Sequence, residues 1–215
     1  SNYLPPPPPG VLIVEPFAGS AGYSLRHGAG RDVLLVDRDP VIVSIWDYLI
    51  NADPDQVLDL PTLKRGESID EHDLTAPEKA LIGFWLNKGK PIPSKSLSKW
   101  SVDYPGQFWG DKAKKRLALQ IPHLKRWQVK LGNYTLADVG DAFYHVDPPY
   151  EKAGVFYRHG SSGINYADLA SWCKSLDGSV HVCEAAGASW LPFEPFRKTK
   201  AMTKGEGRYS FEVLW

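Results

Sequence analysis

A short β-branched run that leads into a glycine-rich turn constrains the fold of this chain more than any other feature. Val11 to Val14 form the run, and a helix-compatible stretch begins at Tyr23. Strand, glycine turn and helix make the unit that brings backbone close to a nucleotide-like ligand at the carboxyl end of a parallel strand. A complete G-x-G-x-x-G is absent, so the pattern does not favour a dinucleotide. The turn consists of Glu15, Pro16, Phe17, Ala18, Gly19, Ser20, Ala21 and Gly22.

An acidic residue ends a second apolar run. Val33 to Val36 read as a strand, and Asp37 follows it. An acid at the end of the second strand of such a unit is placed to accept hydrogen bonds from ribose hydroxyls. An ordinary α/β crossover would show the same two features, so the pair indicates a nucleotide-like ligand without proving one.

The four residues Asp147, Pro148, Pro149 and Tyr150 follow the apolar run Ala142 to Val146, where a buried strand would end. Asp147 can accept a hydrogen bond from the exocyclic amino group of a planar base, and Pro148 can accept another through its backbone C=O. Such acceptors localise the nitrogen lone pair, which is otherwise delocalised into the ring. Tyr150 can stack on the base, which is worth roughly 1–3 kcal/mol. A plain strand-to-loop turn is the competing interpretation.

In this order the three segments resemble the cofactor-binding and catalytic motifs of the amino-methyltransferases of DNA, specifically the Dam-like (D12 class) adenine-N6 group. The matching parts run from Val11 to about Asn51 and from about Trp127 to Trp215. The resemblance implies an α/β, Rossmann-like methyltransferase fold. This is a mostly parallel sheet with helices on both faces, an antiparallel strand near the C-terminus and a small, mainly helical insert. It also implies S-adenosyl-L-methionine as the cofactor.

The activity implied by the resemblance is transfer of a methyl group from S-adenosylmethionine to N6 of an adenine that has left the DNA duplex. The transfer is a direct displacement without a covalent enzyme intermediate, and we expect Asp147→Ala to retain cofactor binding and lose transfer. Three alternatives stay open: cytosine N4 as the target, RNA or a free nucleotide as the substrate, and a protein that binds cofactor or nucleic acid without catalysis. The resemblance assigns Asp147 to Tyr150 to catalysis, and to the cofactor it assigns Glu15 to Gly22, Asp37, Asn133, Tyr134 and Asp147.

Two positions depart from the family pattern around the cofactor. Ala21 stands where the family often has a second glycine. The acidic-aromatic pair that often follows the third strand of the family is matched here by Asn133 and Tyr134, after the predicted strand Trp127 to Leu131. Asn133 can pair with an amino group through its side-chain oxygen but carries no charge. Asp138 is the competing candidate.

Positive charge is concentrated in the middle of a chain whose formal net charge is zero. Between positions 88 and 130 there are eleven Lys and Arg residues and two acidic residues, interleaved with Trp, Tyr and Phe. Basic residues with interleaved aromatics can contact phosphates and stack, so we expect duplex DNA as the partner. A solvated helix over Lys112 to Gln120 and a Trp-rich core are the alternative. The candidate nucleic-acid contacts are Lys95, Lys99, Lys112, Lys115, Arg116, Tyr157, Arg158 and His159.

Proline and glycine punctuate the rest of the chain. Residues 1–10 read as a proline-rich N-terminal arm, residues 11–58 and 126–215 as the catalytic domain, and residues 59–125 as an insert that recognises DNA. Pro54, Pro61 and Gly66 predict a loop over residues 53–73. The other predicted elements are helices over Pro40 to Leu49 and Tyr166 to Leu176, a strand over Ser179 to Cys183, and a basic hairpin whose last strand, Tyr209 to Trp215, finishes the sheet.

Composition favours one compact enzyme, since 215 residues can bury about 70% of their unfolded surface in a single core. No apolar run approaches about 18 residues and no secretory leader is evident, so we expect no membrane partner. Cys173 and Cys183 are too few for a disulfide framework, which fits the cytoplasm of a bacterium or phage-infected cell. The six histidines share no metal-ligand spacing with the cysteines, so no metal is expected. The size is compatible with a monomer and with a phage or restriction-modification enzyme.

Overall fold

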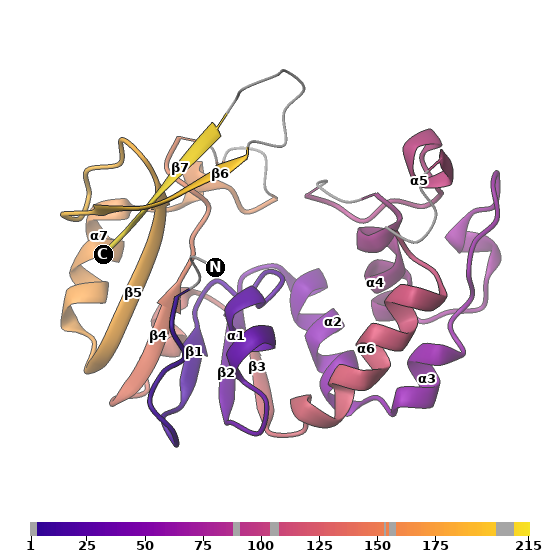
Figure 1. The fold of residues 1–215 in the computed structure, drawn as a ribbon, viewed down its shortest axis with the longest axis horizontal. Helices are drawn as coiled ribbons and strands as arrows, with labels where there is room; N and C mark the ends of the chain where they lie inside the picture. The colour runs from indigo at the N-terminus through magenta and orange to yellow at the C-terminus, as the bar shows by residue number, and fades with distance from the viewer. Residues whose placement is uncertain (1–3, 88–90, 104–107, 153, 155–157, 201–208) are drawn as a thin grey trace. The chain divides into compact units, whose positions relative to one another are not determined.

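The computed structural model divides the chain into two compact units (Figure 1). We call Ser1–Arg38 with Lys130–Trp215 the sheet unit, and Asp39–Val129 the helical unit. The helical unit begins earlier than the predicted insert at residues 59–125, because helices that precede residue 59 pack within it. The functions predicted for these parts stay predictions. The structure describes residues 4–87, 91–103, 108–152, 154, 158–200 and 209–215.

Among the described residues, seven strands form one sheet in the order β3-β2-β1-β4-β5-β7-β6. β2, β1, β4 and β5 pair in parallel, whereas β7 is antiparallel to both of its neighbours. The predicted α/β, Rossmann-like class, with a mostly parallel sheet and an antiparallel strand near the C-terminus, is therefore confirmed. The strands are β1 (Ile13–Glu15), β2 (Val33–Asp37), β3 (Trp127–Leu131), β4 (Ala142–Val146), β5 (Gly178–Ala185), β6 (Glu194–Lys200) and β7 (Tyr209–Leu214).

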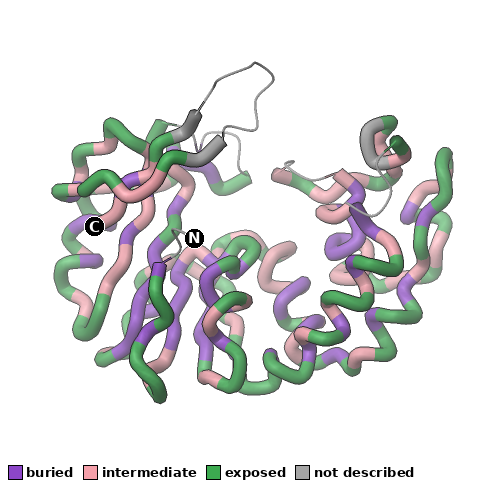
Figure 2. The backbone as a smooth tube through the Cα atoms, in the orientation of Figure 1, coloured by how far each residue is buried: buried purple, intermediate pink, exposed green. Residues whose placement is uncertain are grey.

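The three central strands β1, β2 and β4 are buried along almost their whole length, as the purple segments in Figure 2 show. Their sequences are near-continuous apolar runs, which is typical of parallel strands covered on both faces. In register, Val14 lies opposite Leu34 on one side and opposite Tyr144 on the other. These side chains belong to the main hydrophobic core of the sheet unit.

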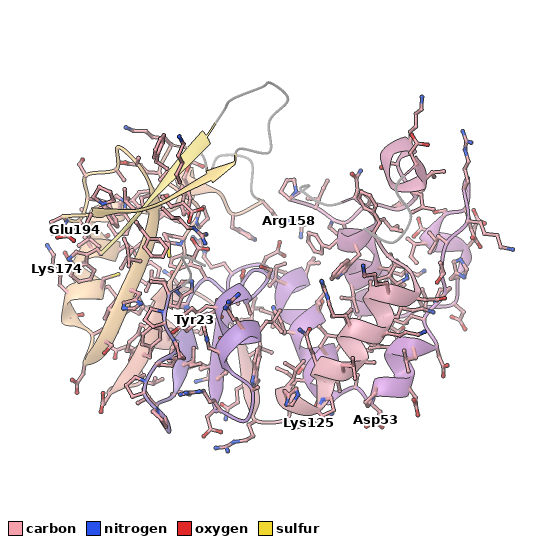
Figure 3. All side chains as sticks on the ribbon, viewed as in Figure 1. Tyr23, Asp53, Lys125, Arg158, Lys174 and Glu194 are labelled. Carbon is pink, nitrogen blue, oxygen red and sulfur yellow. The ribbon has the colours of Figure 1, made fainter. Side chains whose placement is uncertain are left out.

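Helices cover both faces of these strands. Successive residues of a strand point to opposite faces, so their contacts identify the face. Tyr23, labelled in Figure 3, extends from α1 and stacks on Phe143 and His145, with ring centroids 5.1 and 4.6 Å apart. Leu169 of α7 instead belongs to the core that contains Tyr144. The helical elements are α1 (Gly22–His27), α2 (Pro40–Asn51), α3 (Pro54–Leu58), η1 (Ile69–Glu71), α4 (Ala76–Leu86), α5 (Lys99–Asp103), α6 (Asp111–Leu124), η2 (Tyr134–Ala137), η4 (Ser161–Gly163) and α7 (Tyr166–Ser175).

The C-terminal hairpin differs from the prediction in which strand finishes the sheet. The last strand, β7, lies between β5 and β6, so β6 forms the edge. Its composition suits an edge, because Pro195 has no N–H to donate to a ladder and because charged side chains such as that of Lys198 discourage pairing with another strand. The sequence predicted the basic hairpin, but not that its first strand would form the edge of the sheet.

The proline-rich N-terminal arm is bonded to the sheet unit from residue 4 onward. Tyr23 donates its hydroxyl to the carbonyl of Pro5 at 2.7 Å. Arg31 donates to the carbonyls of Pro7 and Pro8 at 3.1 and 2.7 Å. Proline carbonyls have no strand or helix partner of their own here, so these side chains satisfy them.

Two lysines of the basic segment serve the helical unit itself. Lys114 of α6 donates to the carbonyls of Leu58, the last residue of α3, and Leu60 at 3.0 and 2.9 Å. Lys125, labelled in Figure 3, donates to the carbonyls of Ile50 and Ala52 at 3.1 and 2.7 Å. Cations at helix C-termini satisfy the last carbonyls and match the helix dipole. Part of the positive charge counted in the sequence therefore stabilises the fold. Within the described residues, no helix has both the length and the apolar character needed to cross a membrane.

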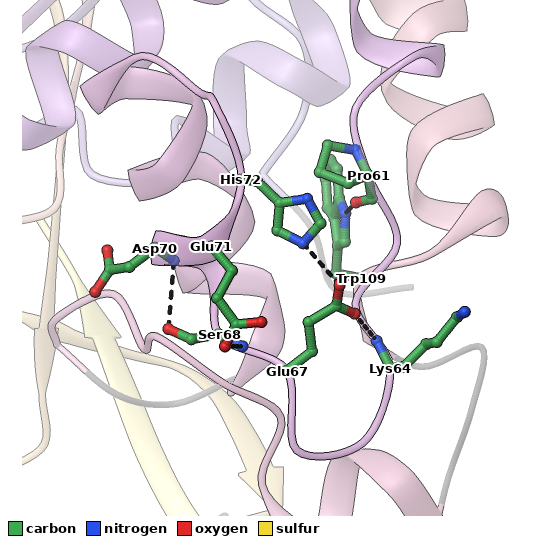
Figure 4. Close-up of polar contacts among 8 residues, drawn as sticks. All are labelled: Pro61, Lys64, Glu67, Ser68, Asp70, Glu71, His72 and Trp109. Atoms are coloured by element: carbon green, nitrogen blue, oxygen red, sulfur yellow. Dashed lines mark hydrogen bonds and ion pairs between the residues drawn. The ribbon is translucent and has the colours of Figure 1, made fainter.

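The predicted loop over residues 53–73 is wrong in part, because α3 and η1 lie within it. Asp53 caps α3 and Pro54 occupies its first turn, which is a favourable start for a helix. Further on, Glu67 accepts from the backbone N–H of Lys64 at 2.6 Å and lies 3.1 Å from His72 (Figure 4). The segment is thus held by many local hydrogen bonds and is not an open linker.

Candidate functional site

Three acidic residues lie at the carboxyl ends of three neighbouring strands. β2, β1 and β4 are adjacent and parallel, so these ends meet at one edge of the sheet. Glu15 ends β1, Asp37 ends β2, and Asp147 follows β4. The chain leaves β1 towards β2 and β3 and then returns to the other side of β1 as β4. Open α/β sheets bind ligands at such a switch point, and all three predicted motifs lie there.

The turn after β1 is tied to the end of β2. The backbone N–H of Ala18 donates to the carbonyl of Val36 at 3.0 Å. The next residue, Gly19, donates its N–H to Oδ2 of Asp37 at 2.9 Å. The carbonyl of Asp37 accepts in turn from Gly132, which begins the loop after β3. Asp37 thus links the two predicted cofactor loops through both its side chain and its backbone.

Glu15 is a buried carboxylic acid, only 3% exposed. Its Oε1 accepts from the backbone N–H of Ser24, in the first turn of α1, at 2.7 Å. Burial raises the pKa of Glu15 to about 7, the hydrogen bonds from Ser24 lower it, and the charge of Asp147 raises it further. Ionisation of a buried carboxyl group such as that of Glu15 costs free energy, unless a positive charge lies beside it.

Ala21 adopts the left-handed conformation that glycine adopts more readily, with φ 45° and ψ 46°. A left-handed alanine costs about 1–2 kcal/mol, while Gly in its place costs about 0.4–1 kcal/mol through the unfolded state. We therefore expect Ala21→Gly to stabilise the protein by between about 0 and about 1.6 kcal/mol, and Ala21→Val to destabilise it. Urea denaturation measures both, and equal stability of the Val and Ala forms would contradict this account.

The loop after β3 brings an aromatic ring to the turn after β1. Tyr134 stacks on Phe17 with ring centroids 5.7 Å apart and an angle of 28° between the planes. Asn133 caps η2 and accepts the backbone N–H of Tyr134 at 2.8 Å through its side chain. Asp138, the competing candidate, lies at the opposite end of η2. Of these two candidates, Asn133 is the one that directly follows Gly132, whose backbone N–H is bonded to Asp37.

The segment after β4 places a carboxylate and a phenol together. Pro148 is buried, and Tyr150 is half-buried. Tyr150 forms a side-chain hydrogen bond with Asp147. Asp147 is accessible to solvent, yet protein surrounds it closely enough that loss of hydration, followed by repulsion from Glu212, raises its pKa to about 6; Tyr150 and Arg197 oppose the rise.

Three charged residues near Asp147 were missing from the sequence-based prediction. Glu184 is 1% exposed and belongs to β5, which continues two residues past the predicted end at Cys183. Arg197 of β6 donates through Nε to Glu212 of β7. The sequence did contain a signal for Glu184, because it directly follows a predicted apolar strand, as Asp147 does. Among the described side chains, no group of three or more His, Cys, Asp or Glu is placed to hold a metal ion.

Four of the predicted nucleic-acid contacts lie on exposed parts of α5 and α6 in the helical unit. Lys112, Lys115 and Arg116 occupy positions of α6 that share one face, and all three are exposed. The guanidinium of Arg116 also lies 4.9 Å from the centroid of the Trp85 ring. Lys99 is exposed at the start of α5.

The remaining candidate contacts are distributed between both units. Lys95 of the helical unit forms an ion pair with Asp70 at 2.6 Å, and both are exposed. Arg158 and His159 of the sheet unit are exposed in a turn after the catalytic segment. Tyr157 lies outside the described residues. Exposure leaves these cations accessible to a polyanion, and their role in binding stays a prediction.

The sequence matches no protein-family model and no curated protein. Solved structures that match this chain include the following two. One is a conserved hypothetical protein from Streptococcus pyogenes, 12% identical over 95% of this chain and 85% of its own, with a TM-score of 0.41. The other is the rRNA methyltransferase AviRa from Streptomyces viridochromogenes, 15% identical over 95% of this chain and 76% of its own, with a TM-score of 0.43. At these values neither neighbour bears on what this chain binds or acts on.

Proposed function

We propose that this chain is an S-adenosylmethionine-dependent methyltransferase that acts on the N6 amino group of adenine in DNA. The observation that carries the proposal is the position of Asp147 to Tyr150. The segment directly follows β4, at the switch point, and β4 pairs with β1, whose carboxyl end leads into the turn from Glu15 to Gly22. Asp37 ends β2, on the other side of β1. A base-binding segment and a nucleotide-binding turn thus share one edge of the sheet.

The acidic residues at this edge suit a cofactor that carries positive charge. Glu15 and Asp147 both have raised pKa values because they lose hydration, and the charge of Asp147 adds to the shift of Glu15. S-adenosylmethionine, when bound, supplies an electrophilic methyl group on a positively charged sulfur. Glu15 and Asp147 would stabilise this charge, and Asp37 would accept hydrogen bonds from the ribose hydroxyls.

The catalytic segment supplies the groups that an aromatic amine needs in order to react. Asp147, once ionised, accepts one N–H of the amine, and the carbonyl of Pro148 accepts the other. Both acceptors localise the nitrogen lone pair and aim it in one direction, so most of the rate gain comes from positioning and fixed dipoles. Tyr150 lies against the ring face. The flipped base costs a few kcal/mol to unstack and unpair, roughly the amount that stacking on an aromatic side chain returns.

A methyl-transfer assay tests this proposal. The protein is incubated with unmethylated duplex DNA and S-adenosylmethionine that carries an isotope-labelled methyl group, and the DNA is digested to nucleosides for mass spectrometry. We expect labelled N6-methyldeoxyadenosine. Sequencing of the modified positions then gives the recognised site.

Parallel reactions decide between the alternatives. If the product is N4-methyldeoxycytidine, the target base is cytosine and not adenine. If RNA or free nucleotides are methylated and duplex DNA is not, the substrate is RNA or a nucleotide. Heat of S-adenosylmethionine binding in calorimetry without product on any substrate would mean a binding protein. Neither heat nor product would overturn the proposal entirely.

A further inference from the structure

Three polar groups of the backbone around Tyr150 are each held by a separate partner. The described residues 147–152 lie outside the regular helices and strands, so their conformation depends on these contacts. A side chain at position 154 would not fit, because an added Cβ would lie 2.6 Å from the carbonyl carbon of Pro149. The three contacts are Tyr166 Oη to the Pro149 carbonyl, Gly154 N–H to the Tyr150 carbonyl at 2.6 Å, and Glu151 N–H to Glu184 Oε2 at 3.0 Å.

Glu184 accepts three N–H donors in a buried position. Besides Glu151, the indole N–H of Trp190 donates to Oε2 at 3.1 Å, and the backbone N–H of Ala185 donates to Oε1 at 2.7 Å. A carboxylate that is 1% exposed is costly unless its oxygens are bonded in this way. The geometry therefore fixes Glu184 as a rigid acceptor for the N–H that follows Tyr150.

An aromatic pair joins the two sides of this arrangement. The rings of Tyr166 and Trp190 pack with centroids 5.4 Å apart. One ring bonds the carbonyl before Tyr150 through its hydroxyl, and the other bonds Glu184 through its indole N–H. The result is a closed circuit of side chains from the start of α7, the end of β5 and the loop that follows β5. We call Tyr166, Glu184 and Trp190 the Tyr150 brace.

We propose that the Tyr150 brace consists of positioning residues that orient the Tyr150 ring for stacking on the target base. This inference rests on the proposed function. The brace holds the peptide groups on both sides of Tyr150, so it sets the direction of the Cα–Cβ bond and the range of ring orientations. The hydroxyl of Tyr150 also bonds Asp147, so a displaced ring would disturb the acceptor for the amine. A misplacement of about 1 Å can cost roughly a hundredfold in rate.

The test removes single donors and keeps the rings. Tyr166→Phe deletes the hydroxyl, and Trp190→Phe deletes the indole N–H. Both variants are expected to lower the single-turnover rate by about tenfold to a hundredfold and to leave the dissociation constant of S-adenosylmethionine, measured by calorimetry, unchanged. With 2-aminopurine at the target position, both variants should also give brighter fluorescence than the wild type, because stacking on Tyr150 quenches the flipped base.

A matched control separates positioning from loss of stability. The hydroxyl of Tyr144 donates to the carbonyl of Gly140 at 2.7 Å, before the amino end of β4, and accepts from the backbone N–H of Val139 at 3.2 Å. The hydroxyl of Tyr166 likewise has a second partner, the side chain of Ser161. Tyr144→Phe thus removes the same kind of bond from the same unit without altering the Tyr150 brace. We expect it and Tyr166→Phe to lower the melting temperature by a similar amount, about 2–5 °C, and we expect only Tyr166→Phe to slow transfer.

A double-mutant cycle with Tyr150→Ala completes the experiment. If Tyr166 acts through the Tyr150 ring, Tyr166→Phe should change the rate of the Tyr150→Ala protein by less than about twofold. An additive cycle, or a wild-type rate for Tyr166→Phe in an otherwise active enzyme, overturns the role of the brace and leaves the proposed function standing. A wild-type protein that methylates no substrate overturns both.

Discussion

Asp147→Ala is expected to lower the rate of methyl transfer by about 10²–10³-fold, the usual loss when one pre-aligned polar group of a reaction centre is removed. The physical reason is the acceptor that Asp147 offers to the exocyclic amine. Without it, the lone pair stays delocalised and the amine loses one of its two fixed contacts. Asp37 and the turn after β1 remain, so the affinity for S-adenosylmethionine should stay within about tenfold, a change of up to about 1.4 kcal/mol. Single-turnover kinetics and calorimetry measure the two quantities separately.

Asp147→Asn and the pH dependence give the control for this prediction. The raised pKa of Asp147, about 6, means that the carboxyl group is protonated and unable to accept at lower pH. The wild-type kcat/KM should therefore fall as the pH drops through about 6. Glu15, with a pKa near 7, is the other acid that titrates here, so the Asn variant decides between them. If its residual activity shows the same fall with the same midpoint, Asp147 is not the group responsible.

The strands were the most predictable part of this fold. β4 begins and ends at the predicted residues, since a parallel strand covered on both faces is a short apolar run bounded by polar residues. β3 also has its predicted bounds, although it is the edge strand of the sheet and is buried mainly at Trp127. α3 was missed for the opposite reason. Pro54 was taken as a helix breaker, although a proline in the first turn after Asp53 starts a helix well. The order β5-β7-β6 needs pairing information that no local pattern contains.

The candidate site was predictable only where it is built from adjacent residues. Glu15 to Gly22 and Asp147 to Tyr150 are contiguous, so residue type and order were enough to single them out. Tyr166 and Trp190 act on a carbonyl and on a buried carboxylate that lie far away in sequence. Nothing in the sequence marks a main-chain carbonyl as the partner of a particular tyrosine. Such contacts follow from the packing of α7 and β5 and require the three-dimensional structure.

Glu15→Gln is expected to stabilise the protein at alkaline pH and to have little effect at acidic pH. Burial raises the pKa of Glu15 from 4.5 to about 7, so the folded state holds a proton that the unfolded state has released between these values. Stability attributable to this group is therefore fully present below about pH 4.5 and is lost as the pH rises to about 7. A shift of this size corresponds to about 3 kcal/mol. Glutamine keeps an oxygen for the Ser24 N–H and cannot ionise.

Thermal unfolding of the two proteins at pH 5 and pH 8 measures the effect. Allowing for the weaker hydrogen bond of a neutral acceptor, we expect a gain of about 2 kcal/mol at pH 8, which is roughly 4–8 °C for a chain of this size. Ala137→Ser, which adds a hydroxyl to the main hydrophobic core and no group that titrates in this range, should show no comparable dependence on pH. Saturating S-adenosylmethionine should narrow the gap between wild type and Glu15→Gln, because the positive cofactor stabilises the ionised acid and does not stabilise the amide in the same way. An equal difference in melting temperature at both pH values would mean that Glu15 does not titrate in this range. A gap that the cofactor leaves unchanged would place the positive charge away from Glu15.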